Sequence, residues 1–229
     1  MGDLVLAVDC STTASKAIAW DREGRAVADA RAPLEEIRPT PSESEQVAEG
    51  WWDATAQALR EVVDAVGADR VAGLCITHQR ESYAPVDAEN RSLRNAILWD
   101  DGRAGAQLAE LGERFGHDEL HRRTGRGPSL TQAFPKLLWL VQNEPDAAER
   151  AHRFMDAHGY LVQRLTGEWA TSLASADSFG VSSGRPSTRP LPSVTSNCAP
   201  GAAGWKTSLT LAPCESSSDR AAWTSVTTR

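Results

Sequence analysis

Eight consecutive residues near the amino terminus combine the groups that hold phosphate and a metal ion. Asp9 ends a run of apolar β-forming residues, hydroxyls follow at Ser11, Thr12 and Thr13, and a cation stands at Lys16. Amides and hydroxyls can donate to phosphate oxygens, the carboxylate can hold the waters of Mg²⁺, and lysine neutralises charge. The segment predicts a phosphate and Mg²⁺ site with Asp9 facing the metal. A plain polar turn between two strands is the alternative.

A second polar group follows a predicted buried strand, Val71–Thr77. It consists of His78, Gln79, Arg80 and Glu81. In open α/β sheets, ligands bind beyond the carboxyl ends of strands. These side chains offer donors and acceptors in fixed directions, as the vicinal hydroxyls of a sugar or polyol require. The segment predicts contacts to such a molecule, and a solvated polar loop with a local ion pair is the alternative.

An aromatic residue followed by two acids is the third candidate. Trp99 closes a predicted strand and precedes Asp100 and Asp101. An indole can form an apolar wall against the C–H face of a sugar, while the acids order nearby donors. We therefore take Trp99 and Asp101 as candidate substrate-binding residues. The alternative is a core tryptophan at a strand end, followed by a helix N-cap.

Two other sets of residues carry no predicted chemistry. His117 and His121 stand four residues apart, but a zinc-protease helix needs glutamate directly after the first histidine, where this chain has Asp118. The four cysteines form no C-x-x-C pair, so we expect reduced thiols.

The elements that must position these groups follow from the apolar periodicity. The predicted strands are Leu4–Val8, Ala17–Trp20, Ala26–Ala30, Val71–Thr77, Tyr83–Val86 and Ala96–Trp99. The predicted helices are Val47–Val66, Ala104–Phe115, Pro135–Gln142 and Gly159–Leu165. Ser42 and Glu45 have the spacing of a capping box before the first helix. This order of strands and helices predicts an α/β fold.

The composition is that of an ordinary globular protein. Of the 229 residues, 41% are hydrophobic and 24% are charged, and the formal net charge is -7. An acidic chain lacks the basic surface that releases counterions from nucleic acid, and the apolar runs are too short to span a bilayer. The amino terminus has no basic segment before its short apolar run. We therefore expect a cytoplasmic protein whose partner is a small molecule, neither nucleic acid nor membrane.

The composition changes abruptly after Val181. Residues 1–181 carry 19 Lys and Arg against 29 Asp and Glu, whereas residues 182–229 carry 5 against 2, with 17 Ser and Thr. We expect one domain over 1–181 and a low-complexity, poorly packed tail over 182–229. A flexible linker, an interaction tail or translation in a shifted reading frame would explain the tail. We favour the shifted frame, because the Arg-, Ala- and Gly-rich body indicates a GC-rich gene.

Taken in order, the segments from about residue 3 to 181 resemble the FGGY carbohydrate kinases, which include glycerol kinase and xylulokinase. Asp9–Lys16 is similar to their amino-terminal phosphate loop, Ile76–Ser82 to their polyol-contacting loop, and Ala96–Ala104 to their W-x-D-x-R segment. Four further landmarks follow in the family's order: Thr124–Gly125, Phe134–Trp139, Tyr160–Glu168 and Ala174–Asp177.

The resemblance implies an actin-like, ribonuclease H-like α/β domain. Intact relatives pair it with a second such domain around ATP and Mg²⁺. The implied reaction transfers the γ-phosphoryl group of ATP to a hydroxyl of a sugar or polyol. In this resemblance Asp9 orders Mg²⁺, and Thr12, Thr13 and Lys16 approach the γ-phosphate. Ser11 stands where the family usually has glycine.

The same resemblance implies that Arg80 and Glu81 hold substrate hydroxyls, with Trp99 and Asp101 around them. The W-D-D-G-R run and the T-G-E-W-A-T segment look more like xylulokinase-type enzymes, so D-xylulose is the expected substrate. Glycerol or another polyol is the alternative. Thr131 stands where glycerol kinases carry a substrate-contacting tyrosine, which weakens the case for glycerol.

In the family, the aspartate that acts as general base lies beyond the point corresponding to Val181, and we find no candidate for it in the remaining sequence. We therefore expect the 229-residue chain to lack kinase activity. A fragment that binds sugar without turnover is the alternative class of function, and an actin-like structural protein is another. A homodimer is compatible with the sequence.

Overall fold

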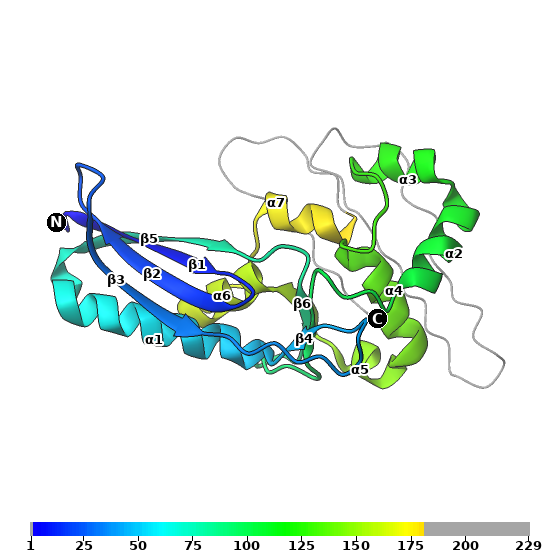
Figure 1. Ribbon diagram of the computed structural model, residues 1–229, viewed down its shortest axis with the longest axis horizontal. Helices are drawn as coiled ribbons and strands as arrows, with labels where there is room; N and C mark the ends of the chain where they lie inside the picture. Colours follow the sequence, from blue (N-terminus) through cyan, green and yellow to red (C-terminus); the bar gives the residue numbers. More distant parts are fainter. Residues whose placement is uncertain (1, 181–229) are drawn as a thin grey trace.

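The computed structural model describes residues 2–180, which form two four-stranded sheets with helices packed on them (Figure 1). The strands are β1 (Leu4–Cys10), β2 (Ala14–Trp20), β3 (Ala26–Pro33), β4 (Glu45–Gln46), β5 (Val71–His78), β6 (Tyr83–Val86), β7 (Ala96–Ile97) and β8 (Arg153–Asp156). The helices are α1 (Ala48–Val66), α2 (Gly105–Phe115), α3 (His117–Thr124), α4 (Ala133–Asn143), α5 (Pro145–Arg150), α6 (Ala157–Thr166) and α7 (Leu173–Ala176). Two 3-10 turns, η1 (Ala68–Arg70) and η2 (Asp177–Phe179), complete the order.

The predicted α/β class is confirmed, and every strand and helix expected from the periodicity is present. The elements β4, β8, α3, α5 and α7 were not predicted, because each is short and its neighbours decide its burial. The expected tail, residues 182–229, lies outside the described residues.

The first sheet, sheet A, has the strand order β3-β2-β1-β5. β1 pairs antiparallel with β2 and parallel with β5. Alternate β1 residues, Leu4, Leu6 and Val8, pack against Ala58 and Val62 of α1. Figure 1 shows α1 running along one face of this sheet. The amphipathic pattern that predicts the helix therefore also determines which face of sheet A is buried.

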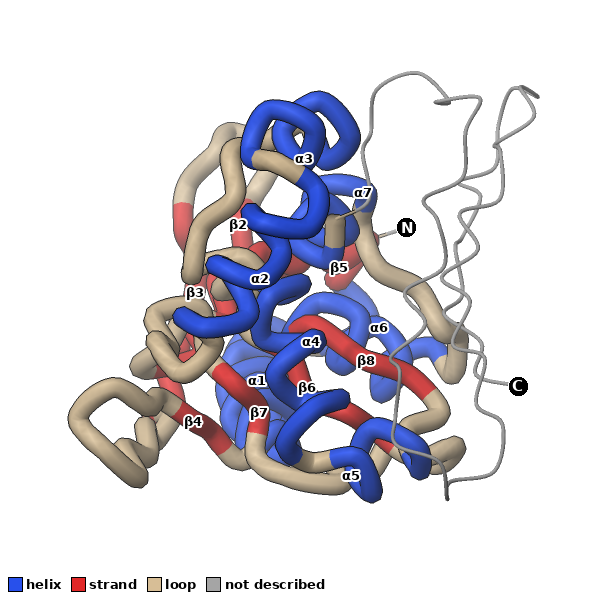
Figure 2. Tube along the Cα trace, turned by 90° about the vertical axis from the view of Figure 1, so that its right-hand side faces the viewer, coloured by secondary structure: helices blue, strands red, loops and turns tan. Residues whose placement is uncertain are grey.

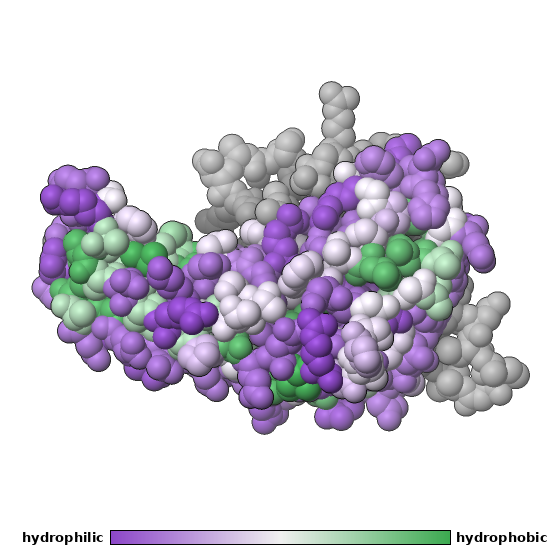
Figure 3. All heavy atoms as spheres, viewed as in Figure 1, coloured by the Kyte–Doolittle hydropathy of each residue, from purple (hydrophilic) through white to green (hydrophobic). Residues whose placement is uncertain are grey.

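The expectation that β5 is a buried strand is wrong. β5 lies at the edge of sheet A, and four consecutive residues, Ala72 to Cys75, are exposed. α1 packs chiefly across β2 and β3, so it leaves the middle of β5 uncovered, while Val71 and Ile76 near its ends pack against the apolar cluster. Val5, on the neighbouring strand, is also exposed. Figure 3 shows hydrophobic residues at the surface at its left end, where sheet A and α1 lie.

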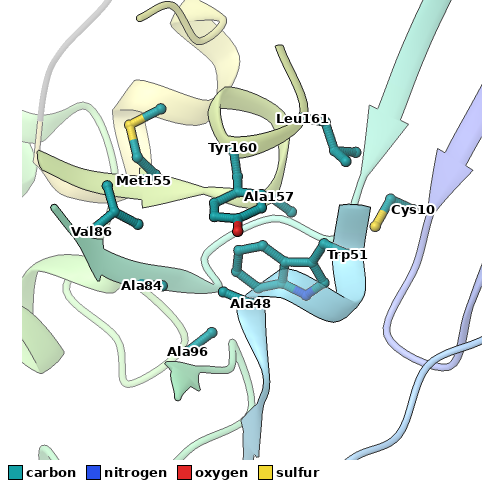
Figure 4. Packing of buried hydrophobic residues seen from close by; sticks show 10 residues of the cluster. All are labelled: Cys10, Ala48, Trp51, Ala84, Val86, Ala96, Met155, Ala157, Tyr160 and Leu161. Atoms are coloured by element: carbon teal, nitrogen blue, oxygen red, sulfur yellow. The ribbon is translucent and has the colours of Figure 1, made fainter. Parts of the chain in front are cut away.

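The second sheet, sheet B, has the strand order β4-β7-β6-β8 and is buried on both faces. Ala84 and Val86 of β6 face a cluster with Trp51 of α1 and Tyr160 of α6, whose rings meet edge to face (Figure 4). On the other side, Tyr83 packs with residues of α4 and α5. Figure 2 shows the strands of sheet B between these helices.

The predicted capping box at Ser42 and Glu45 is also wrong. Val47 is the N-cap of α1, and no side chain caps the helix there. Glu45 instead lies in β4, where its buried carboxylate accepts hydrogen bonds from Arg94 and Arg103. The spacing of Ser42 and Glu45 is that of a capping box, but the Glu45 carboxylate is hydrogen-bonded to two arginines that are distant in the sequence.

Candidate functional site

The first two predicted motifs leave neighbouring strands at the same end of sheet A. β1 and β5 are parallel, and their last residues are in register, with Cys10 opposite His78. The Gln79 amide then donates to the Cys10 carbonyl at 2.8 Å, so the two loops start side by side. The sheet topology therefore brings the predicted phosphate turn (Asp9–Lys16) next to the predicted sugar loop (His78–Glu81).

A cleft of about 360 Å³ opens between these loops. Eight residues line it, and each was a candidate from the sequence: Asp9, Ser11, Thr12, His78, Gln79, Arg80, Glu81 and Trp99. Thr13 and Lys16 are exposed outside the lining, although Lys16 lies opposite Asp9 in the β1–β2 register. Asp101 is buried away from the cleft.

Asp101 has a complete set of partners within the protein. Its carboxylate accepts from the Ser44 amide at 2.7 Å and from Arg103 Nη2 at 2.8 Å. Such a carboxylate holds two segments together and has little capacity left for a ligand. The structure therefore does not bring Asp101 to the other candidates.

The phosphate turn is held in place by backbone and side-chain hydrogen bonds. The Ser11 amide and hydroxyl both donate to the Ala14 carbonyl at 2.9 Å, and Gln46 Nε2 donates to the Thr12 carbonyl at 2.6 Å. Among the described residues, positive φ at a non-glycine residue occurs at Glu81 and Asn90, so Ser11 adopts its conformation without that strain. Serine in place of the family's usual glycine therefore fits this turn.

The sugar loop is anchored by a chain of buried amides. Gln79 Nε2 donates to Gln46 Oε1 at 2.8 Å, and Trp51 Nε1 donates to the same oxygen at 2.9 Å. Ser82 Oγ donates to Gln79 Oε1 at 2.9 Å. Because these amides are buried and paired, the direction of the Gln79 side chain is defined before any ligand binds.

Arg80 and Glu81 belong to a ring of alternating charges at the cleft. Arg80 pairs with Asp177, and Arg126 pairs with Glu81 and lies 3.8 Å from Asp177 Oδ2. Glu81 has φ of 68°, the left-handed conformation that lets the chain turn directly after Arg80. Sequence reasoning gave no role to Arg126 or Asp177. Arg126 follows the landmark Thr124–Gly125 and Asp177 ends the landmark Ala174–Asp177, so the family resemblance was the signal in the sequence that pointed to them.

His78 is held by hydrogen bonds at both ring nitrogens. Its Nδ1 lies 2.8 Å from the Gln79 carbonyl, which can only accept, so this nitrogen carries the proton. Its Nε2 lies within hydrogen-bond distance, 2.9 Å, of the Ser175 hydroxyl. The neighbouring His158 is partly buried, and this burial lowers its pKa. Burial also raises the pKa of the Cys10 thiol to about 12, so this cysteine next to Asp9 stays protonated.

The donor set at the turn fits phosphate and a hydrated cation. The exposed Asp9 carboxylate and the hydroxyls of Ser11 and Thr12 share one wall of the cleft. Within residues 2–180 no group of three or more His, Cys, Asp or Glu residues is arranged to hold a metal. A single carboxylate suits Mg²⁺, which keeps several of its waters and is also held by substrate phosphates. Asp9 is the residue that would hold those waters.

Comparison with known proteins decides the family. The model of the FGGY family of carbohydrate kinases, N-terminal domain, matches residues 4–181. The chain belongs to this family. The FGGY family is a family of phosphotransferases that use ATP, and the expected actin-like architecture is confirmed by its solved members.

Individual FGGY relatives include kinases with two different named substrates. Xylulose kinase from Streptomyces coelicolor is 34% identical over 181 residues, which cover 78% of this chain and 37% of that protein. Glycerol kinase from Thermococcus gammatolerans is 30% identical over 178 residues, covering 75% and 36%. The crystal structure of xylulose kinase from Rhodospirillum rubrum superposes with a TM-score of 0.74 at 28% identity, over 77% of this chain and 37% of that one. The chain thus spans a little over a third of the length of these relatives.

No helix within the described part of the chain is both long and apolar enough to cross a membrane.

Proposed function

We propose that this FGGY domain forms the sugar-binding half of an ATP-dependent kinase that phosphorylates a hydroxyl of a ketose, with D-xylulose as the substrate. The observation that carries the proposal is the cleft itself. Asp9, Ser11 and Thr12 on one wall can face phosphate and Mg²⁺, while Arg80, Glu81 and Trp99 can face a sugar. A sugar hydroxyl in this cleft would lie beside the phosphate to be transferred, and such positioning accounts for much of the catalysis of phosphoryl transfer.

The polar side chains of the cleft suit a polyhydroxylated ligand. Glu81 is buried and can accept hydrogen bonds from vicinal hydroxyls, while Arg80 can donate to their oxygens. The Trp99 side chain is 42% exposed, which leaves its indole free to cover the C–H face of a sugar. The charge ring with Arg126 and Asp177 keeps both charged groups oriented.

One observation favours a ketose over glycerol. Xylulose kinases at 34% and 32% identity are among the relatives, but glycerol kinases reach the same identities, so identity does not separate the two substrates. Thr131, at the position of the glycerol-contacting tyrosine, is not part of the cleft lining, and its hydroxyl is paired with Ser129 Oγ at 2.7 Å. Glycerol kinases are nevertheless among the relatives, so glycerol is the competing ligand in the test.

The test is titration calorimetry of the 229-residue chain with D-xylulose and with glycerol, followed by an assay for ATP-dependent phosphorylation. We expect saturable binding that is tighter for D-xylulose. Glu81→Gln should weaken it by about tenfold or more, since hydrogen bonds to a charged group are lost. Glu119→Gln is the matched control, because Glu119 also pairs with arginines but lies on α3, outside the cleft lining.

Each outcome has a distinct meaning. Binding with turnover supports a kinase that is active as this chain, whereas binding without turnover supports a sugar-binding domain that needs further residues for catalysis. Tighter binding of glycerol would replace the proposed substrate. Saturable binding of neither ligand would overturn the sugar site.

A further inference from the structure

Lys136, on α4, is a fully buried lysine whose charge the proposed mechanism does not use. Its ammonium donates to three backbone carbonyls: Leu98 at 2.7 Å, Trp99 at 2.9 Å and Thr131 at 3.0 Å. An ammonium has three donors, so these bonds use all of them. A buried charge is costly unless it is fully paired, and here the backbone supplies the pairing.

Two of these carbonyls belong to the backbone that carries the cleft wall. The Trp99 amide donates to Ser82 Oγ at 3.1 Å, and the Trp99 carbonyl accepts from Lys136. The backbone of Trp99 is thus hydrogen-bonded at its amide and at its carbonyl. Because the Trp99 backbone is fixed, the allowed side-chain rotamers place the indole in a small number of directions.

The indole then crosses the cleft to the phosphate turn. Trp99 Nε1 donates to Thr12 Oγ1 at 3.2 Å, and both residues line the cleft. The contacts therefore run without interruption from the buried ammonium on α4, through Trp99, to the hydroxyl of Thr12.

We propose that Lys136 is a positioning residue for this cleft: its three hydrogen bonds hold the Leu98–Trp99 backbone so that the Trp99 indole forms the sugar-facing wall and meets Thr12. The assignment rests on the proposed function, because it takes the cleft as the sugar site. Lys136 itself touches no substrate, since it is buried behind the backbone that it holds.

A purely structural role for Lys136 is the competing explanation, and the same helix offers a matched control. Leu140 lies four residues further along α4 and is also fully buried, but it packs in the apolar cluster with Tyr83 and Ile97. Leu140→Ala should lower the melting temperature without altering the Trp99 backbone. Lys136→Gln retains two of the three donors and shortens the side chain, so it should release the backbone at Leu98–Trp99.

The first measurement needs no ligand. The indole N–H resonance of Trp99 is assigned by its loss in Trp99→Phe and then compared in Lys136→Gln and Leu140→Ala. We expect it to move in Lys136→Gln and to stay in place in Leu140→Ala. The second measurement is the affinity for D-xylulose, which should fall by about tenfold in Lys136→Gln, because a displaced indole no longer covers the C–H face of the sugar. It should remain unchanged in Leu140→Ala.

The proposal is overturned if Lys136→Gln leaves the Trp99 resonance unchanged. It is also overturned if Leu140→Ala, at the same loss of melting temperature, changes the resonance and the affinity as much as Lys136→Gln does. If Lys136→Gln does not fold, Lys136→Arg retains the cation with a different donor geometry and undergoes the same comparison. If the unaltered chain binds no sugar, the proposed function fails, while the resonance still tests the positioning.

Discussion

The side chains around the cleft are oriented by buried polar partners. Gln79 is held by Gln46 and Ser82, and Trp99 by Ser82 and Lys136. Burial lowers the pKa of Lys136 to about 8. Nearby carboxylates, led by Asp101, offset this effect only in part.

The lowered pKa of Lys136 predicts how stability depends on pH. Between about pH 8 and the unfolded value of 10.5, the unfolded chain keeps the Lys136 proton and the folded chain loses it. The unfolded state binds more protons there, so the free energy of unfolding should rise with pH. We expect the wild-type chain to gain on the order of 1–3 kcal/mol relative to Lys136→Met between pH 7 and 10.

Urea denaturation of both proteins across this pH range measures that difference, and titrations common to both proteins cancel. A difference that stays constant from pH 7 to pH 10 would show that Lys136 keeps an ordinary pKa in the folded chain.

At the level of secondary structure, α1 and sheet A form one apolar layer whose extent depends on where the helix lies. Leu6 on β1 is 3% exposed under α1, whereas Leu74, its register partner on β5, is 38% exposed. Two leucines on adjacent strands therefore differ in burial because α1 covers one strand and not the other.

This difference predicts unequal effects of the same substitution. Leu6→Ala should lower the free energy of unfolding by about 2–5 kcal/mol, because it removes buried methyl groups and leaves a cavity. Leu74→Ala should change it by about 0.5 kcal/mol or less, as at other exposed positions. Urea denaturation of the two variants checks this, and equal losses would mean that β5 is covered in solution.

Considered as a whole, the molecule assembles its cleft from both sheets. Asp9 and His78 come from the ends of sheet A strands, whereas Trp99 follows β7 of sheet B. A ligand in the cleft would therefore contact segments from both sheets and stabilise their association.

Ligand binding should accordingly raise the melting temperature of the whole chain. D-xylulose at about 100 times its Kd should add about 2.7 kcal/mol, equivalent to roughly 5–10 °C for a chain of this size. Scanning calorimetry measures the shift. Arg80→Gln should abolish most of it, while Arg122→Gln, which alters an exposed arginine on α3, should retain it. A shift that survives in Arg80→Gln would place the sugar elsewhere.

Much of the fold and the site was predictable because it depends on local patterns. Apolar periodicity identified β1 and α1, and polar residues directly after strands identified Asp9, Arg80 and Glu81. The capping-box prediction at Glu45 failed because its spacing is local, whereas the arginines that use its carboxylate lie about fifty residues away.

The order of residue types along the chain was enough to indicate the α/β class, the family and the residues that line the cleft, because strand ends and turns are determined by neighbouring residues. The partners of those residues came only from the folded chain. Asp101 is hydrogen-bonded to Arg103 and Ser44 outside the cleft lining, and Lys136 donates to the Trp99 carbonyl from behind the cleft wall. Burial makes each polar group take whichever partner the packing brings within reach, and packing depends on all elements together.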